Sequence, residues 1–502
     1  MSGSVDMQRD HAIPASFRRL RSLFDRAAIR RLSACVALFM VSGALILPNL
    51  GSPRGIIFDE TYYITHAQKY LNGIFFLESH PPLGKLLIAA GEHLLHPNAL
   101  ADEFIDVDKV DRAWPPDVDI TGYRLMPALF GILNPILVFI LLVLMVGQEL
   151  FAFAISMFIA WDNALIVQSR AALLDSFLIF FCLASVLVFV LLLGMPSGRL
   201  RNFLLLTAVW GILQACAANI KLSGAVVLVL AAVYALRLFR LNQTRRLLTF
   251  GAVFLFFFAV TYLGLWQVHF GIAWQINPAK NYGVSDAYWN ILIGADHSDP
   301  LTRFVIQFKD AFAYHLKTSF DVPGLDLSNP NEIGSPWYWW LVGGRAIDYR
   351  WQSLDNVHFQ YVYLLGNPVT WLVSLLGVIS GTVLVIADLF IRFLHDRRRH
   401  WLYVVVLLYW AYMIPLALSS RVTYLYHYLL PMILGVMMFG IVLWQATRVP
   451  ARVKYGVVLL ALVLAVLAFW TYKPLTYAEP LTRQQFENLN VYPLWDMKCA
   501  GC

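Results

Sequence analysis

The chain has 502 residues, of which 59% are hydrophobic and only 14% are charged, and its mean hydropathy is +0.63. A soluble globular chain carries roughly 25% charged residues, so this composition excludes an ordinary soluble protein. The net charge of +7 does not indicate nucleic-acid binding, because no basic, aromatic-interleaved soluble segment is present in the sequence to make such contacts.

Eleven apolar segments are each long enough to cross a bilayer as a helix. They lie near residues 33–50, 123–146, 149–168, 172–194, 202–219, 222–238, 247–266, 367–390, 401–419, 425–444 and 455–472. These segments predict an all-α polytopic membrane protein with about eleven transmembrane helices. The first helix is expected to stay uncleaved, because no clear small-x-small cleavage site follows it and many further spans do.

Lysine and arginine gather in the segments that would face the cytoplasm if the N-terminus lies inside. These segments are 1–32, 195–201, 237–246, 392–400 and 445–454, and together they hold 20 of the 38 basic residues. The positive-inside rule therefore predicts a multi-pass protein of the plasma (inner) membrane with a cytoplasmic N-terminus.

This topology divides the chain into five regions. They are a basic cytoplasmic N-terminus (1–32), a first transmembrane module (33–266) that contains an outer loop at 51–122, a large outer loop (267–366), a four-helix transmembrane region (367–472) and an outer tail (473–502). The two outer loops are rich in Pro, Trp, Asp and His, so chemistry is expected on the periplasmic or extracellular face.

The first outer loop contains two adjacent acids, Asp59 and Glu60, directly after an apolar triplet. Apolar and aromatic residues then recur at helical spacing over 61–71, which predicts a short helix on the membrane surface. An Asn-Gly pair would end this helix, and HPPLGK at 80–85 would begin another. The helix dipole is expected to favour an ionised Asp59, and a carboxylate at the lipid boundary is suited to accept a proton from a hydroxyl. Alternatively, the two acids only cap and solvate the helix.

Later spans carry polar residues near the outer face, where burial is costly unless the group is functional or paired. These residues are Arg124, Arg170, Asp175, Lys221, Arg421 and His427. Simpler interpretations remain for several of them. Arg124 and Lys221 could snorkel to the headgroups. Asp175 could cap a helix, and His427 could belong to an interfacial aromatic belt.

The cysteines and histidines give weaker indications. Cys35, Cys182 and Cys216 lie in apolar spans and are expected to be packing residues. Cys499 and Cys502 form a terminal CAGC on the outer side, where a disulfide between them is compatible with an oxidising compartment. The spacing of histidines and acids fits no metal-site pattern, so a requirement for a divalent metal is left open.

Seven motifs follow one another in a recognisable order. They are FDE (58–60), HPPLGK (80–85), YRLMPALFG (123–131), SRAALLDS (169–176), AANIKLSG (217–224), LLGNP (364–368) and SRVTYLYHYLLP (420–431). Together they resemble the protein O-mannosyltransferase family of integral membrane glycosyltransferases of the GT-C type, over about residues 33–475. The resemblance implies transfer of mannose from a polyprenyl-phosphate donor to Ser or Thr hydroxyls of secreted or membrane proteins, without a cofactor.

The resemblance also implies roles for individual residues. Asp59 would be the general base, and Glu60 would help to position the acceptor or the sugar. Arg124 would anchor the site acids or the donor phosphate, and Lys221 would lie near the lipid phosphate. The other residues implied to bind the lipid side or support the site are His80, Lys85, Arg170, Asp175, Arg421, Tyr426 and His427.

One base acting opposite a departing phosphate predicts a single inverting displacement. Cationic side chains could stabilise the leaving group without a metal ion. The family's larger members insert a β-trefoil in the later outer loop, for which 267–366 has no room, so the acceptor could also be a glycan or a lipid such as lipid A. A transporter or flippase of lipid-linked sugars is the further alternative, and assembly as a homo-oligomer is left open.

Overall fold

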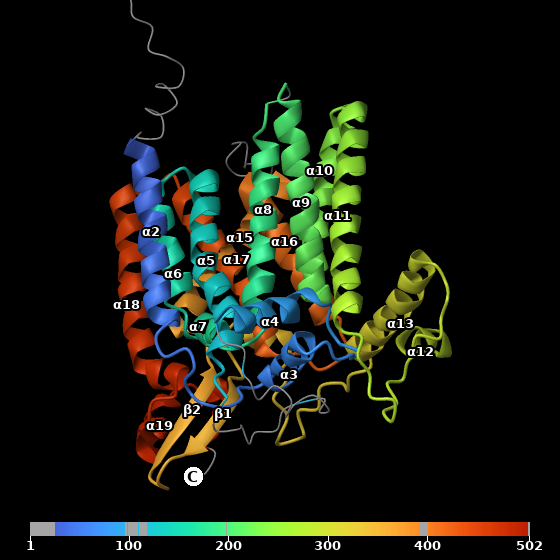
Figure 1. The fold of residues 1–502 in the computed structure, drawn as a ribbon. Helices are drawn as coiled ribbons and strands as arrows, with labels where there is room; N and C mark the ends of the chain where they lie inside the picture. Colours follow the sequence, from blue (N-terminus) through green and yellow to red (C-terminus); the bar gives the residue numbers. More distant parts are fainter. Residues whose placement is uncertain are drawn as a thin grey trace, which may run out of the picture.

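The computed structural model describes residues 26–95, 98, 109, 118–196, 198–391 and 400–499. Within these ranges, ten helices are long and apolar enough to cross a membrane. They are α2 (Arg26–Ile46), α5 (Thr121–Val146), α8 (Asp175–Leu193), α9 (Leu200–Ile220), α10 (Leu228–Arg240) with the 3-10 turn η2 (Leu222–Val227), α11 (Thr244–Ile272), α15 (Pro368–Ile391), α16 (His400–Ala417), α17 (Leu429–Gln445) with the 3-10 turn η4 (Leu425–Tyr428), and α18 (Ala451–Tyr477). These helices form one upright bundle (Figure 1).

The segment predicted as a continuous span at 149–168 is instead broken. Helices α6 (Glu149–Ala160) and α7 (Asn163–Arg170) meet at an angle of 62°, so the bundle has up to eleven spans if this pair counts as one. Asp162 lies at the break, where its carboxylate accepts hydrogen bonds from the Leu165 and Asn367 backbone N–H groups and from the Trp371 indole, each at 3.0 Å. The break is therefore held by a cap and by a distant part of the chain.

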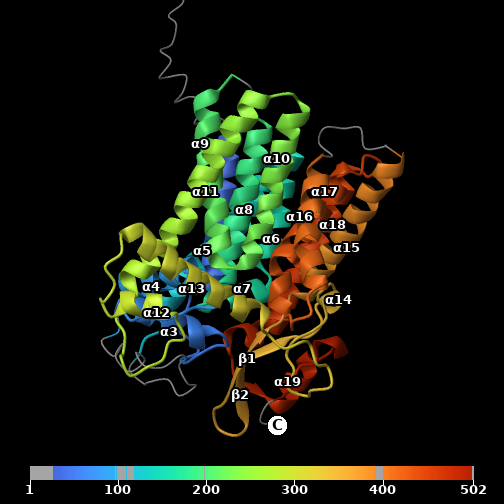
Figure 2. The same ribbon diagram turned by 90° about the vertical axis from the view of Figure 1, so that its right-hand side faces the viewer.

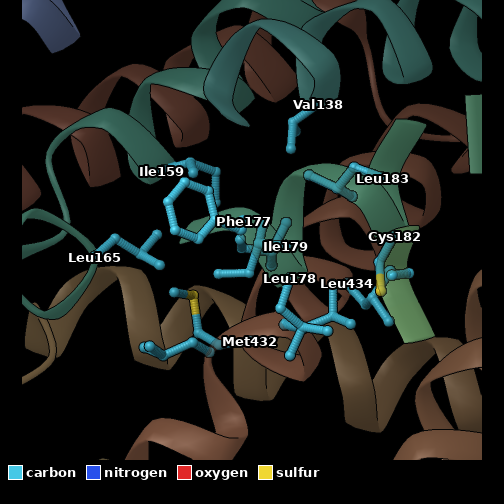
Figure 3. Close-up of a cluster of buried hydrophobic side chains, with 14 of the residues drawn as sticks. Val138, Ile159, Leu165, Phe177, Leu178, Ile179, Cys182, Leu183, Met432 and Leu434 are labelled. Atoms are coloured by element: carbon cyan, nitrogen blue, oxygen red, sulfur yellow. The ribbon is translucent and has the colours of Figure 1, made fainter. Parts of the chain in front are cut away.

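The hydrophobic core lies where α8 packs against its neighbours. Figure 3 shows side chains of α5, α6, α7, α8 and α17 converging there, among them Val138, Ile159, Leu165, Phe177 and Met432. Helices α15 and α17 approach so closely that a Cβ placed on Gly377 would lie 2.0 Å from the carbonyl oxygen of Gly435. Such an approach requires glycine on the helix surface.

Shorter elements gather at one end of the bundle, where the predicted outer loops lie (Figures 1 and 2). They are α3 (Glu60–Leu71), α4 (Leu83–Leu95), α12 (Asp286–Leu292), α13 (Pro300–Phe320), α14 (Trp337–Trp340), α19 (Arg483–Leu489) and η5 (Pro493–Trp495). The helix predicted at 61–71 is thereby confirmed, and it ends at the predicted Asn-Gly pair, where Asn72 is the C-cap and Gly73 has a φ of +71°. Its position on the membrane surface stays a prediction.

The sequence analysis did not predict a small antiparallel sheet at the same end. Its strands are β1 (Ile347–Ser353), β2 (His358–Leu364) and β3 (Leu481–Thr482), in the order β1-β2-β3. A bulge interrupts the β1–β2 register between Asp348 and Arg350. A separate core that includes Tyr361, Phe486 and Trp495 joins this sheet to the C-terminal tail. In the described part of the chain β1 is therefore an edge strand.

Candidate active site

Asp59 lies on a sharp turn just before α3 and faces a groove of about 940 Å³ between α3 and β1. Phe58 has a φ of +48°, which is rare for a residue with a large side chain. Its N–H donates to the Tyr349 carbonyl at 3.1 Å, and its ring stacks on the Tyr349 ring at 4.4 Å. This fixed turn directs the next residue into the groove. Among the described residues the Asp59 side chain makes no capping hydrogen bond to α3, which disfavours the interpretation that it only caps the helix.

The pKa of Asp59 is shifted in the opposite direction to that expected from the helix dipole. Burial raises the pKa of Asp59 to about 6, although the charge of Lys221 opposes this rise and that of Asp175 adds to it. Desolvation of the carboxylate therefore outweighs the helix dipole that was expected to favour ionisation. A pKa near neutrality makes this carboxylate a stronger base than a solvated aspartate while leaving it mostly ionised at pH 7.

Glu60 points the other way and is completely buried. Its carboxylate binds the Arg124 guanidinium through Nε at 2.7 Å and Nη2 at 2.8 Å, and it accepts the backbone N–H groups of Ile57 at 2.8 Å and Ala172 at 2.7 Å. Both oxygens are therefore occupied by protein donors. This geometry does not support the expected contact of Glu60 with the acceptor or the sugar.

Arg124 is also completely buried, and protein groups occupy its donors. Besides Glu60, it donates to the carbonyl oxygens of Leu50 and Gly55 at 3.2 Å and of Pro53 at 3.3 Å. The guanidinium therefore ties the start of the first outer loop to α5 and Glu60. Of the two roles expected for Arg124, this arrangement fits the anchoring of a site acid and does not support contact with a donor phosphate.

A second cavity, of about 400 Å³, lies beside the groove. Its polar lining includes His80, Lys221, Arg421, Tyr426 and His427, and side chains of α13 and α16 supply apolar walls. A cavity lined by cationic side chains and apolar walls suits a phosphate that carries a hydrocarbon chain.

Lys221 lies between α9 and η2 and is held in place by an acid. Its Nζ is 2.8 Å from Asp175 Oδ1, and it lies 5.0 Å from the centre of the Tyr426 ring. Asp175 Oδ2 accepts from Gln168 Nε2 at 2.6 Å, and Gln168 Oε1 accepts from the Tyr349 hydroxyl at 3.1 Å. Since Tyr349 lines the groove, this chain of hydrogen bonds connects the two cavities. The sequence analysis missed both Gln168 and Tyr349.

Two aromatic rings lie between the cavities. Phe58 lines the groove and Tyr426 lines the second cavity, and their rings meet edge to face at 6.1 Å. The Tyr426 ring also stacks on His427 at 4.5 Å. Arg421, at the other end of the same motif, donates to the Ser319 carbonyl oxygen and so joins the motif to α13.

Buried charged side chains hold the HPPLGK segment in place from the protein interior. Lys85 is completely buried and donates to the carbonyl oxygens of His80 and Pro81, each at 2.9 Å, and it lies 3.3 Å from Glu78. Glu78 also pairs with His66, and although burial opposes this, His66 and Lys85 hold the pKa of Glu78 well below its usual range. Lys85 is thus an internal support for the loop that carries His80. The sequence analysis missed Glu78, the acidic partner of Lys85, although Glu78 lies only two residues before the HPPLGK motif.

Other predicted residues lie apart from the two cavities. Arg170 does not meet Asp175 and instead binds the carbonyl oxygens of residues 46, 48 and 49, at 2.7, 2.8 and 2.9 Å, at the end of α2. Cys35, Cys182 and Cys216 are free, and Cys499 is disulfide-bonded. Cys502 of the predicted pair lies outside the described residues. No group of three or more His, Cys, Asp or Glu side chains in the described ranges could hold a metal ion.

The pKa of Asp59 gives a testable pH dependence. If Asp59 acts as a base, the kcat/KM for an acceptor should fall about tenfold per pH unit below an apparent pKa of about 6, because the protonated acid cannot accept a proton. The measurement is the pH profile of transfer between pH 4.5 and 8. A flat profile in this range, with the protein still folded, would contradict the assignment.

Comparison with known proteins shows which family the chain resembles. A sequence model described as dolichyl-phosphate-mannose-protein mannosyltransferase matches residues 36–277, and one for the C-terminal four TMM region of protein-O-mannosyltransferase matches residues 309–495. Protein O-mannosyltransferase 1 of Drosophila pseudoobscura pseudoobscura is 33% identical over 48% of this chain and 27% of its own length. Dolichyl-phosphate-mannose–protein mannosyltransferase 1 of Saccharomyces cerevisiae is 28% identical over 42% of this chain and 24% of its own length. The chain thus spans about a quarter of the length of the curated relatives it matches.

The fold has a solved counterpart. The S. cerevisiae protein O-mannosyltransferase Pmt1-Pmt2 complex bound to the sugar donor superposes with a TM-score of 0.80 at 15% identity, over 96% of this chain and 95% of that one. The protein is therefore a polytopic membrane protein with the GT-C fold, as predicted. With the two sequence models spanning most of its length, the chain belongs to the protein O-mannosyltransferase family.

Proposed function

We propose that the protein is an inverting glycosyltransferase that moves a mannosyl group from a polyprenyl phosphate to Ser or Thr hydroxyls of secreted or membrane proteins. One observation carries the proposal: the Asp59 carboxylate faces a groove of about 940 Å³, while Lys221 lines an adjoining cavity with apolar walls. The groove suits the acceptor, and the cavity suits the lipid-linked donor. Family membership and the relatives' names supply the identity of the sugar.

The reaction follows from the positions of these groups. Asp59 takes the proton from the acceptor hydroxyl as its oxygen bonds to the anomeric carbon of the sugar. The bond from that carbon to the phosphate oxygen breaks, and the electron pair leaves with the lipid phosphate. Lys221, held by Asp175, and Arg421 on the wall of the same cavity stabilise this charge. Base and leaving group act on opposite faces of the sugar, so the configuration inverts.

The orientation in the membrane follows the charges. Basic segments at the start of α9 and between α10 and α11 lie at the end of the bundle away from the sheet and the site (Figure 1). By the positive-inside rule, this distribution supports a site on the periplasmic or extracellular face of the plasma membrane, with the N-terminus in the cytoplasm.

The deciding experiment uses the purified full chain with polyprenyl-phosphate mannose, a Thr-containing peptide and, separately, a lipid acceptor such as lipid A. We expect release of polyprenyl phosphate and one added hexose on the peptide threonine, located by mass spectrometry. Hexose found only on the lipid would show that the acceptor is a lipid and not a protein. Movement of the donor across a vesicle membrane without its consumption would indicate a flippase and overturn the proposal.

Replacement of Lys221 tests the donor side of the site. Lys221→Met should lower kcat by about 10²-fold or more, because one charge that stabilises the departing phosphate is lost. Lys221→Arg should recover part of this loss. Lys317, an exposed lysine on α13, is a matched control, and Lys317→Met should stay within about twofold of the parent. Equal losses for the two methionine variants would contradict a specific role for Lys221.

A further inference from the structure

The edge of strand β1 faces the groove that contains Asp59. Six successive residues of this strand, from 348 to 353, line the groove together with Ile56, Phe58 and Asp59. Side chains of a strand alternate between the two faces of a sheet, so a lining of consecutive residues means that the backbone edge itself borders the groove. An edge strand offers unpaired N–H and C=O groups to another chain.

The register identifies which backbone groups point outward. The Leu354 N–H donates to the His358 carbonyl at 2.9 Å, so these two residues face each other as a hydrogen-bonded pair. Gln352 lies two residues before Leu354 and is paired with Gln360. Hydrogen-bonded and non-bonded pairs alternate along an antiparallel ladder, so Gln352 directs its backbone groups to β2. Trp351 and Ser353 therefore direct theirs away from β2. Among the described residues no backbone partner meets these outward groups, and both residues are exposed.

The same edge is already used next to Asp59. The Phe58 N–H donates to the Tyr349 carbonyl at 3.1 Å, and the Arg350 side chain binds the Ile56 carbonyl at 3.1 Å. The segment before Asp59 thus occupies the first part of the edge, and the edge opens from Trp351 onward. Trp351 lies two residues after Tyr349, which contacts the residue before Asp59. At about 3.3 Å per residue, the open part of the edge therefore begins roughly 7 Å from Tyr349.

We propose that the acceptor binds as an extended polypeptide segment that adds to the edge of β1 as a further strand, with its hydroxyl residue beside Asp59. This inference rests on the proposed function and names the form of its substrate. Main-chain hydrogen bonds to Trp351 and Ser353 hold the segment, as in other cases of strand addition. Because these hydrogen bonds involve the acceptor's backbone and not its side chains, the enzyme accepts many sequences. The segment must be unfolded, because its backbone groups have to be available for these bonds.

A scan of N-methylated acceptor peptides tests the added strand directly. Only alternate residues of such a strand direct their N–H groups to β1, so methylation should lower kcat/KM with a period of two. We expect losses of about three- to tenfold at engaged positions, as for one lost hydrogen bond, and less than twofold between them. A flat scan, or losses at every position alike, would overturn the added strand.

A variant of the edge provides the second test. Ser353→Pro removes one outward N–H while sparing the pairing with β2, which an edge position tolerates. It should raise the peptide KM about three- to tenfold relative to Ser353→Ala, with the donor KM and thermal melting unchanged. Equal peptide KM values for the two variants would count against the proposal. If the parent enzyme mannosylates no peptide at all, the proposed function itself fails, which is a different outcome.

Discussion

Asp59→Asn should reduce transfer of mannose to a peptide by about 10²- to 10⁴-fold in kcat, the range expected for loss of a general base. The amide keeps the size of the side chain but cannot accept the proton of the hydroxyl at any pH. Donor binding should change little, because the phosphate would lie with Lys221 in the adjoining cavity. Single-turnover transfer with radiolabelled donor measures the loss, and the acid limb of the pH profile should disappear with it.

A second carboxylate in the same groove provides the control. Asp348 on β1 also lines the groove, so Asp348→Asn changes the local charge by the same amount without removing the expected base. Its activity should stay within about threefold of the parent. If Asp59→Asn retained activity at the level of Asp348→Asn, Asp59 would not be the base, and another acceptor of the proton would have to be sought.

The second large effect concerns stability. Glu60→Gln should lower the free energy of unfolding by about 3–5 kcal/mol, because it leaves the Arg124 guanidinium buried without its counter-charge. Both side chains are fully buried, and the pair joins the first turn of α3 to α5. Melting in detergent, followed by intrinsic fluorescence, should show a clear fall in Tm.

Two ion pairs with exposed arginines at the other end of the bundle provide a reference for this loss of stability. Glu149 binds Arg30 at 2.8 Å and Arg31 at 2.7 Å, with both arginine side chains more than half exposed. Glu149→Gln should cost no more than about 1 kcal/mol, since solvent screens such pairs. Similar Tm values for the Glu60 and Glu149 variants would show that the buried pair contributes no more than a surface one.

The spans and the surface helix α3 could be predicted because apolar length and helical spacing are local properties of the sequence. The break between α6 and α7 could not, since it depends on Asp162 meeting Asn367 and Trp371, some 200 positions along the chain. The sheet was missed for a related reason, because its third strand comes from the C-terminal tail, far along the chain from the hairpin of β1 and β2.

For the candidate site, too, some features could be predicted from the sequence and others could not. Motifs singled out Asp59, Lys221 and the late aromatic segment as candidates, but they could not say where each side chain points. Two adjacent acids of one motif turned out to face opposite ways, Asp59 into the groove and Glu60 into a buried ion pair with Arg124. The partners that orient the site, such as Gln168 and Glu78, are ordinary polar residues in sequence and become informative only through their contacts.

The contact between Phe58 and Tyr426 has one more consequence. These rings lie between two cavities, one bordered by a strand edge and the other by apolar helix faces. In the proposed reaction, a water-borne acceptor chain and a bilayer-borne donor would therefore occupy different cavities, and neither would have to leave before the other binds. We then expect no fixed order of binding, and both substrates would have to be present together before the glycosidic bond breaks.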